Sequence, residues 1–254
     1  EKKKVGQRNI QIRYIENGIV KTKVFDTYFT HHGPIMGMEK GKWLSLQENN
    51  RSLDALMECW TRTKSKNLAD YTKAMELVAN NSNNTVYADA AGNIAYWHGN
   101  YIPRRDATKD WGVPQDGSSS QIDWKGLHSV DEIVHVYNPT SGWIQNCNST
   151  PFTVSGTSSP LRTNYPVYMA PDGENFRDRN AVRLFSQTGK LDLQGLIGLG
   201  YDRHLMAFET LLPALIDAAG QESDLAEVVQ ELKNWDYNAS SSSIAQTIAI
   251  RWGL

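Results

Sequence analysis

Alternating apolar and polar positions open the chain and predict antiparallel strands. The segment Glu16-Asn17-Gly18 separates two such runs: Ile10, Ile12 and Tyr14 before it, and Val20, Thr22 and Val24 after it. Asn-Gly is a strong two-residue hairpin signal, because both residues tolerate positive φ. We therefore predict a first β-hairpin, whose second strand ends in the segment from Thr30 to Ile35, where Gly33-Pro34 ends ladder pairing.

A second hairpin is predicted between Thr85 and Arg105, in the sequence TVYADAAGNIAYWHGNYIPRR. Apolar residues alternate on both sides of the turn residues 89–93: Val86 and Ala88 before them, and Ile94 and Tyr96 after them. We interpret Asp89, Gly92 and Asn93 as scaffold, because Gly permits the turn and Asn satisfies backbone groups.

Helical spacing of apolar residues follows two capping residues and returns in the last third of the chain. Ser52 precedes Leu53, Leu56, Met57 and Trp60, and Asn67 precedes Leu68, Tyr71, Met75 and Leu77. Later apolar faces comprise Leu205, Phe208, Leu211, Leu212, Leu215 and Ile216, then Leu225, Val228, Val229 and Leu232, and a final run after Ser241 to Ser243. This periodicity predicts amphipathic helices.

Between the second hairpin and the helical part, residues 103–171 are rich in Gly, Pro, Ser, Asn and Asp. Loops held on a rigid scaffold often carry function, so this stretch is expected to form walls of a site. We predict an α+β fold in a single fragment spanning residues 1–254, with a sheet- and loop-rich part over about 1–171 and a helical part over about 172–254.

Composition excludes several classes of partner. The 26 basic and 28 acidic residues give a net charge of -2, which supports binding to neither nucleic acid nor an anionic membrane. No apolar stretch approaches the roughly 20 residues that span a bilayer. Cys59 and Cys147 lack metal-ligand spacing and could form one disulfide or none.

Five motifs in order resemble the β-subunit of the penicillin acylase family. They are Thr30-His31-His32-Gly33-Pro34-Ile35, the segment from Val86 to Tyr96, Gly99 with Pro103-Arg104, Trp124-Lys125-Gly126, and the segment from Tyr137 to Pro151 (YNPTSGWIQNCNSTP). Weaker similarity continues through Trp235-Asp236 to the end of the chain. The resemblance covers nearly the whole chain and corresponds to the later part of the family's β-subunit.

The resemblance implies an N-terminal nucleophile amide hydrolase with an αββα sandwich, produced by self-cleavage of a precursor into two subunits. In that family a Ser, Thr or Cys at the start of the β-subunit attacks the amide carbonyl, and its own α-amine or a water held there takes the proton. Glu1 offers no such hydroxyl or thiol. We therefore expect the nucleophile, the N-terminal part of the β-subunit and the α-subunit to lie outside this chain, which alone would be inactive.

Two site residues are implied by the resemblance. Asn148 matches the residue whose side-chain amide donates to the oxyanion of the tetrahedral intermediate, whereas its local context alone favours a turn residue. Arg177 matches an arginine that orients the amine end and the oxyanion Asn, although Arg179 fits the register almost as well. Either arginine could instead pair with Asp178 or cap a helix.

No metal or cofactor is predicted. His31 and His32 suggest a metal or a base, but adjacent residues on a strand face opposite ways, so we interpret them as structural. Some family members bind calcium, but the corresponding stretch here, Ser155 to Val167, contains no Asp or Glu.

The sequence is compatible with several classes of function. The leading hypothesis is an amidase that releases an acyl group from a small acylated amine. Alternatives are a non-catalytic module that binds carbohydrate or peptide through the aromatic-rich loops between Trp111 and Trp143, a relative that has lost the nucleophile, and an interaction protein. The acyl preference is not encoded in identifiable residues, and a periplasmic or secreted location is an expectation from the resemblance alone.

Overall fold

The computed structural model of the chain describes residues 3–49, 52–80 and 83–253. By its contacts the chain divides into two compact units that interleave in sequence. Unit 1 comprises Glu1–Asn83, Gly99–Ile133 and Pro166–Met169, and unit 2 comprises Asn84–His98, Val134–Tyr165 and Ala170–Leu254. The boundary predicted near residue 171 separates a sheet- and loop-rich part from a helical part. It stays a prediction.

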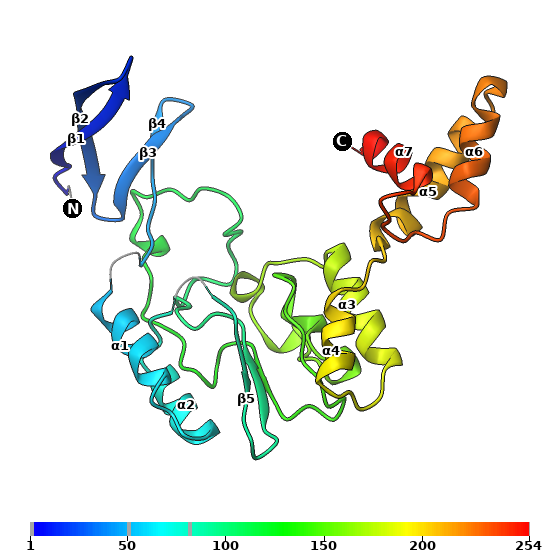
Figure 1. Cartoon of the computed structure of the whole chain (residues 1–254). Coiled ribbons are helices and arrows are strands. Elements are labelled where there is room, and N and C mark those ends of the chain that lie inside the picture. The colour runs from blue at the N-terminus through cyan, green and yellow to red at the C-terminus, as the bar shows by residue number, and fades with distance from the viewer. Residues whose placement is uncertain (1–2, 50–51, 81–82, 254) are drawn as a thin grey trace. The chain divides into compact units, whose positions relative to one another are not determined.

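Unit 1 contains an antiparallel sheet in the order β1-β2-β3-β4, followed by two helices (Figure 1). The strands are β1 (Gly6–Glu16), β2 (Ile19–Thr30), β3 (Gly33–Glu39) and β4 (Lys42–Ser45), and the helices are α1 (Leu53–Arg62) and α2 (Leu68–Met75). The predicted first hairpin is confirmed, with Glu16 paired to Ile19 across the Asn17-Gly18 turn. Both central turn residues have positive φ, at 53° and 77°.

The register of this hairpin divides its apolar residues between two faces. Ile10 lies opposite Phe25 and Ile12 opposite Lys23, whereas Val24 lies opposite Gln11. Since residues directly opposite each other share a face, Val24 points away from Ile10 and Ile12. Every residue of β1 is exposed within the chain, so neither face of the hairpin is buried there.

The predicted end of the second strand is confirmed, because β2 ends at Thr30, but the prediction that ladder pairing ends at Gly33-Pro34 is wrong. Thr30 pairs with Gly33 and Phe29 with Pro34, and β3 continues from there to Glu39. Proline is tolerated because it stands at the start of a strand, and its carbonyl accepts a hydrogen bond from Leu46 N at 2.9 Å. His31 and His32 consequently lie in the turn between β2 and β3 and not on a strand.

Both predicted N-terminal helices are confirmed, together with their caps. Ser52 accepts a hydrogen bond from Ala55 N at the start of α1, and Asn67 accepts one from Asp70 N at the start of α2. Most of the apolar face predicted for α1 is exposed within the chain, and the buried residue of that helix is Glu58. Its carboxylate accepts hydrogen bonds from Ala79 N at 2.8 Å and Asn100 Nδ2 at 3.0 Å.

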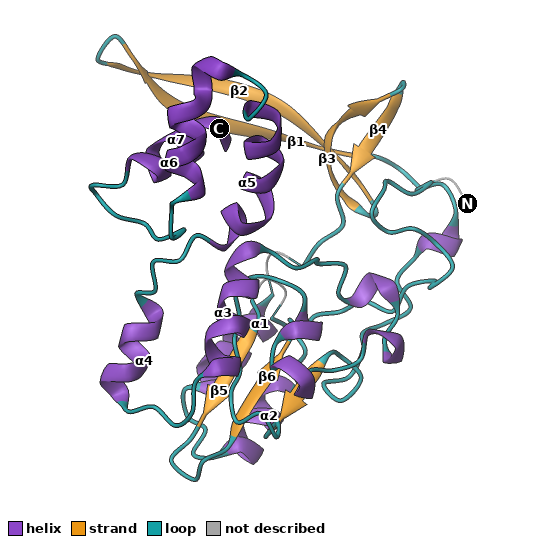
Figure 2. Cartoon of the chain, turned by 90° about the vertical axis from the view of Figure 1, so that its right-hand side faces the viewer, coloured by secondary structure: helices purple, strands orange, loops and turns teal. Residues whose placement is uncertain are grey.

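Unit 2 contains a three-stranded sheet in the order β5-β6-β7, together with helices. Figure 2 shows the strands in orange and the helices in purple. The strands are β5 (Thr85–Ala88), β6 (Ile94–Trp97) and β7 (His135–Tyr137). The second predicted hairpin is confirmed by the pairing of Val86 with Tyr96 and of Ala88 with Ile94. Its strand β6 is buried at Ala95, Tyr96 and Trp97.

Short 3-10 turns and five helices complete the described chain. The turns are η1 (Ser120–Ile122), η2 (Pro151–Thr153), η3 (Gly156–Ser158), η4 (Arg162–Asn164), η5 (Val167–Met169) and η6 (Ser223–Leu225). The helices are α3 (Phe176–Gln187), α4 (Leu193–Gly200), α5 (Met206–Ala219), α6 (Ala226–Lys233) and α7 (Ile244–Gly253). Antiparallel strands first and helices later confirm the predicted fold class.

Helices α5, α6 and α7 share one hydrophobic core. It comprises Phe208, Leu212, Leu232, Trp235, Ala245 and Ala249, and includes three residues of the predicted apolar faces. No helix in the described ranges is both long enough and apolar enough to cross a bilayer.

Candidate active site

Asn148 lies in the loop between β7 and η2, in a left-handed backbone conformation with φ of 54°. Asparagine adopts this conformation more readily than most residues. The Asn146 side chain accepts a hydrogen bond from Asn148 N at 3.2 Å, and Thr150 caps the turn that follows, where Pro151 stands at the first position. The side chain of Asn148 is exposed and not in an apolar interior.

Arg177 contacts this loop from the first turn of α3. Its Nη2 donates to Cys147 O at 2.7 Å and to Asn148 Oδ1 at 3.3 Å. Since Asn148 Oδ1 accepts the hydrogen bond from Arg177, the amide is oriented with Nδ2 on the side away from Arg177. Asn148 Nδ2 donates no hydrogen bond to any described residue, so it remains available as a donor.

Asn175, which the sequence analysis did not single out, ties the same loop to α3. Its side-chain oxygen caps the helix by accepting from Asp178 N at 3.0 Å, and its Nδ2 donates to Cys147 O at 3.0 Å. The spacing Asn175-x-x-Asp178 before a helical run is a recognisable N-terminal signal. That signal would have identified the cap, though not its contact with the loop.

The carboxyl group of Asp178 connects α3 to the two segments that flank the Asn148 loop. It is fully buried and accepts hydrogen bonds from Thr153 Oγ1 at 3.0 Å and from Gln145 Nε2. Burial raises the pKa of Asp178, and the hydrogen bonds from Thr153 and its other neighbours act in the opposite direction. The helix start and both ends of the Asn148 loop are therefore held through one carboxyl group.

The structure distinguishes the two arginines that the sequence left in competition. Arg179 donates to Glu174 Oε2 at 3.0 Å, and Arg183, further along α3, donates to Asn180 Oδ1 at 2.7 Å. Arg177 contacts Asn148, and neither Arg179 nor Arg183 does so among the described contacts. The role of Arg177 stays a prediction, which this contact with Asn148 makes testable.

Both cysteines are free thiols. Cys147 stands beside Asn148, but burial raises the pKa of its thiol, with Arg177 partly opposing the shift. A raised pKa leaves less thiolate near neutral pH, which argues against Cys147 as an activated nucleophile.

The turn of the second hairpin directs its polar groups to its own backbone. Asp89 Oδ1 accepts from Ala91 N and Asn93 N, each at 3.0 Å, and Tyr87 donates to Asp89 Oδ2. The hydrogen bonds from Asn93 hold the pKa of Asp89 below its usual range. These contacts agree with the interpretation of this turn as scaffold.

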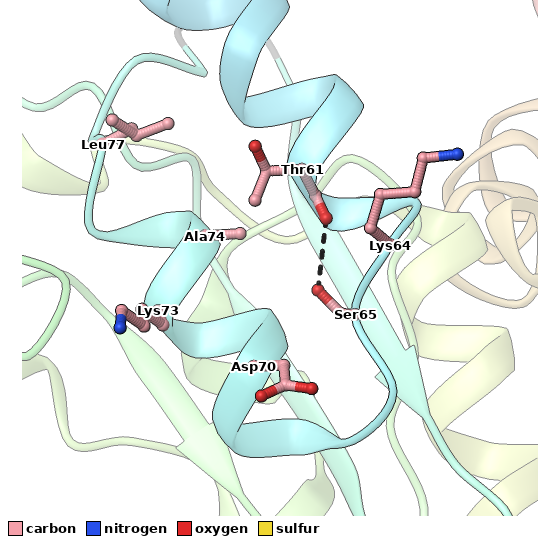
Figure 3. Close-up of a pocket in the computed structure, with 7 residues that line it drawn as sticks. All are labelled: Thr61, Lys64, Ser65, Asp70, Lys73, Ala74 and Leu77. Carbon is pink, nitrogen blue, oxygen red and sulfur yellow. Dashed lines mark hydrogen bonds between the residues drawn. The ribbon is translucent and has the colours of Figure 1, made fainter.

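A surface depression of about 320 Å³ lies between the end of α1 and α2 (Figure 3). It is lined by Thr61, Lys64, Ser65, Asp70, Lys73, Ala74 and Leu77. Within the figure the polar contact drawn is Ser65 Oγ donating to Thr61 O at 3.4 Å. This depression does not include Asn148 or Arg177, and its lining shows no nucleophile paired with a base.

The fold and the order of the five motifs both indicate a protein of the penicillin acylase class. The family model described as penicillin amidase matches residues 1–253, and the chain belongs to this family. Its fold is that of the N-terminal nucleophile hydrolases.

Particular relatives support this membership. Penicillin G acylase of Escherichia coli is 33% identical over 142 residues, which are 54% of this chain and 16% of that protein. The solved structure of a thermostable penicillin G acylase from Alcaligenes faecalis matches with a TM-score of 0.70 at 22% identity, over 94% of this chain and 42% of that one. The chain thus spans less than half the length of these relatives.

Proposed function

We propose that the full-length protein hydrolyses the amide bond between an acyl group and an amine, and that Asn148 donates a hydrogen bond to the oxyanion. The observation that supports this role is the hydrogen bond from Arg177 to Asn148 Oδ1, which leaves the neutral Nδ2 donor of this exposed residue without an acceptor among the described residues. Such a donor, aimed at the developing charge, is what acyl transfer requires.

The chemistry would proceed through an acyl-enzyme intermediate. A nucleophile outside this chain attacks the carbonyl carbon while a neighbouring amine takes its proton, and the carbonyl oxygen becomes negative. Asn148 Nδ2 stabilises that oxygen. Collapse of the intermediate breaks the C–N bond and transfers the proton to the leaving amine. Water then gives a proton to the same neighbouring base and attacks the acyl-enzyme through a second oxyanion at the same donor. Collapse of that oxyanion breaks the bond between the acyl group and the nucleophile, releases the acid and returns the proton to the nucleophile.

Arg177 is proposed as a positioning residue. Its guanidinium is always charged and presents several donors in a rigid plane, so it can hold Cys147 O and Asn148 Oδ1 together. Removing it would let the Asn148 amide rotate and would weaken the stabilisation of the oxyanion without removing the donor.

The remaining parts of the proposal concern partners. An α-subunit and the N-terminal part of a β-subunit would supply the nucleophile, the second oxyanion donor and most of the acyl pocket. Mass spectrometry of the protein purified from its own gene tests this arrangement. We expect two chains, the second beginning with Ser, Thr or Cys, whereas a single uncut chain would contradict it.

Substitution of Asn148 in the full-length protein tests the site. We expect Asn148→Ala to lower kcat by about 100-fold to 1,000-fold, corresponding to roughly 2.7–4 kcal/mol of lost transition-state stabilisation. Asn164→Ala, a change at an exposed asparagine in η4, is the matched control and should leave kcat unchanged. Near-normal turnover of a folded Asn148→Ala variant would reject the role.

A double-mutant cycle separates positioning from a merely structural role. Arg177→Ala should lower kcat in the original protein by more than it does in the Asn148→Ala background, because Arg177 acts through Asn148. Equal effects in both backgrounds, with unchanged unfolding transitions, would mean that Arg177 acts independently. An absence of any turnover in the unsubstituted protein would favour a non-catalytic module or a relative that has lost the nucleophile.

A further inference from the structure

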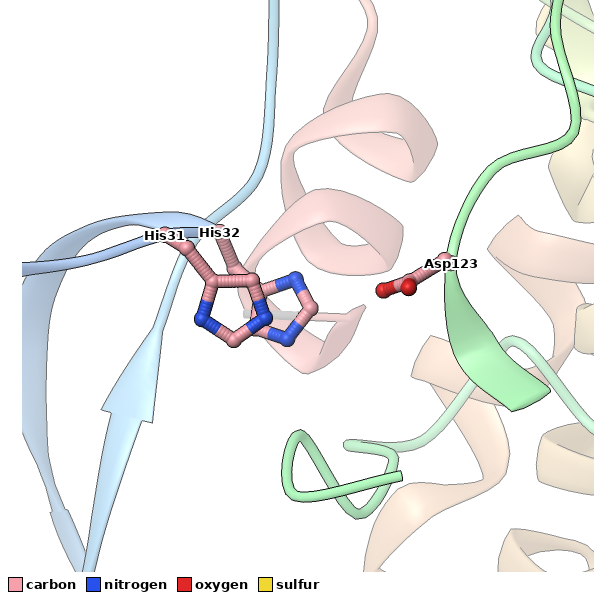
Figure 4. Close-up of side chains that lie close together, drawn as sticks. All are labelled: His31, His32 and Asp123. Atoms are coloured by element: carbon pink, nitrogen blue, oxygen red, sulfur yellow. The ribbon is translucent and has the colours of Figure 1, made fainter. Parts of the chain in front are cut away.

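Three potential metal ligands meet in unit 1, away in sequence from Asn148. His31 and His32 form the turn between β2 and β3, and Asp123 directly follows η1. Figure 4 shows the two imidazole rings side by side and the Asp123 carboxylate directed toward them. One ligand atom from each residue lies within 4.8 Å of the other two.

The position of the histidines in a turn explains why their rings meet. On an extended strand, consecutive side chains point to opposite faces, which was the reason to interpret this pair as structural. In the turn the ring centroids are 3.8 Å apart, so both imidazoles lie on the same side, with one nitrogen of each within 4.8 Å of the other. The premise behind the sequence-based interpretation therefore does not apply here.

The turn is braced by hydrogen bonds from both flanking strands. Thr30 Oγ1 accepts from His32 N at 3.1 Å and lies 2.6 Å from Ser45 Oγ, which in turn donates to Gly33 O at 2.9 Å. Gly33 has φ of 142°, and a Cβ there would approach Leu46 O to 2.0 Å, so the close passage of the chain requires glycine. The backbone that carries both histidines is therefore fixed by its surroundings.

His32 has the outer contacts expected of a metal ligand. Its Nε2 lies 3.0 Å from Gly117 O, and its Nδ1 lies 3.3 Å from Gln47 Oε1. Metal-bound histidines usually donate the ring N–H that faces away from the metal to a carbonyl or carboxylate, which orients the ring. With Nε2–H donating to Gly117 O, Nδ1 carries a lone pair. Gln47 Oε1 is also an acceptor, so in this tautomer the Nδ1 and Oε1 lone pairs face each other at 3.3 Å, and a cation would relieve that repulsion.

The residues around His31 carry charges of both signs. Lys3 repels a cation, whereas the carboxylate of Asp123 attracts one.

We propose that His31, His32 and Asp123 bind one divalent transition-metal ion of the zinc, nickel and copper group. Two imidazoles and one carboxylate suit these ions, whereas calcium and magnesium prefer sites made of oxygen ligands. Tetrahedral zinc with bonds of 2.0–2.2 Å places its ligand atoms about 3.3–3.6 Å apart. The three ligand atoms here lie within 4.8 Å of one another. A fourth position stays open to water, and the ion cross-links the β2–β3 turn to the segment around η1.

Zinc titration of the full-length protein, after removal of metals by a chelator, tests the site. In competition with a colorimetric chelator we expect one site whose affinity falls at least about 100-fold in His31→Gln and in Asp123→Asn, a larger loss than removal of an outer-shell contact produces. The matched controls His204→Gln and Asp131→Asn should retain the affinity. Equal affinity in ligand and control variants, or no binding with Kd below about 1 mM, would overturn the proposal.

A second measurement needs no substitution. Diethyl pyrocarbonate acylates free imidazole nitrogens, and peptide mass spectrometry follows each histidine separately. Zinc at about ten times its Kd should slow acylation of His31 and His32 by roughly 10-fold and leave His204 unaffected. Unchanged rates at His31 and His32 would overturn the proposal whatever the folding of the variants, and neither result depends on amidase activity.

Discussion

The two hairpins of this chain are encoded by the same kind of signal but differ in burial. The β1–β2 hairpin and the β5–β6 hairpin both combine alternating apolar residues with a glycine turn, and both form with the predicted pairing. Every residue of β1 is exposed within the chain, whereas Tyr96 and Trp97 of β6 are 1% and 0% exposed. Local patterns therefore determine strand pairing here, and tertiary neighbours determine burial.

The difference follows from where each hairpin finds its partners. Strand β6 pairs with β5 on one side and β7 on the other, and Trp97 donates a hydrogen bond to Tyr137 at 3.1 Å. The first hairpin pairs with β3 over two residue pairs only, and its apolar residues divide between two faces. A face of mixed composition does not by itself specify which side is to be buried.

The largest effect is expected at Trp97. Trp97→Ala should lower the free energy of unfolding by about 3–5 kcal/mol, because it removes a large, fully buried side chain and leaves a cavity. Equilibrium urea unfolding followed by circular dichroism measures this change. Trp43→Ala, at a position 52% exposed in β4, is the matched control and should cost clearly less. Similar losses at both positions would contradict the contrast in burial.

An intermediate effect is expected at the two hairpin glycines, and it should be the same in both. Gly18 and Gly92 have φ of 77° and 89°, and a Cβ at either position would meet no atom within 4 Å. Replacement by alanine should therefore cost about 1 kcal/mol at each, through backbone strain alone.

Equal losses at Gly18 and Gly92, measured by the same unfolding experiment, would show that turn energetics are local to each hairpin. A loss at Gly92 several times that at Gly18 would mean that burial of β6 amplifies the strain, and the separation of pairing from burial would fail.

The candidate site shows the same limit on what sequence can predict. Helix starts such as Ser52 and Asn67 were predictable because a cap contacts the backbone three residues away. The contact between Arg177 and Asn148 joins residues 29 positions apart through a loop whose path no periodic pattern describes. The motif resemblance suggested both residues, whereas the contacts of Arg177 with Asn148 and of Arg179 with Glu174 are seen only in the structure.

The histidine turn makes this limit most visible. The identity of His31 and His32 was plain in the sequence, yet their chemistry depended on whether they extend β2 or turn away from it. That choice is set by the tight turn that pairs Thr30 with Gly33 and by the close approach of Leu46 to Gly33. The second contact joins residues 13 positions apart and is not a local signal.

The smallest effect is expected at Ile12, and it tests the exposed side of the comparison. Ile12 is 50% exposed in β1 and lies opposite Lys23, so little apolar area is lost when it is shortened. In the 254-residue chain, Ile12→Thr should change the free energy of unfolding by no more than about 0.5 kcal/mol, since threonine also favours strands.

The same substitution in the longer protein proposed above tests whether other residues cover the β1–β2 hairpin. A loss of 1 kcal/mol or more there, with none in the 254-residue chain, would mean that residues outside this chain cover the hairpin. A comparable loss in the 254-residue chain would contradict the exposure of β1.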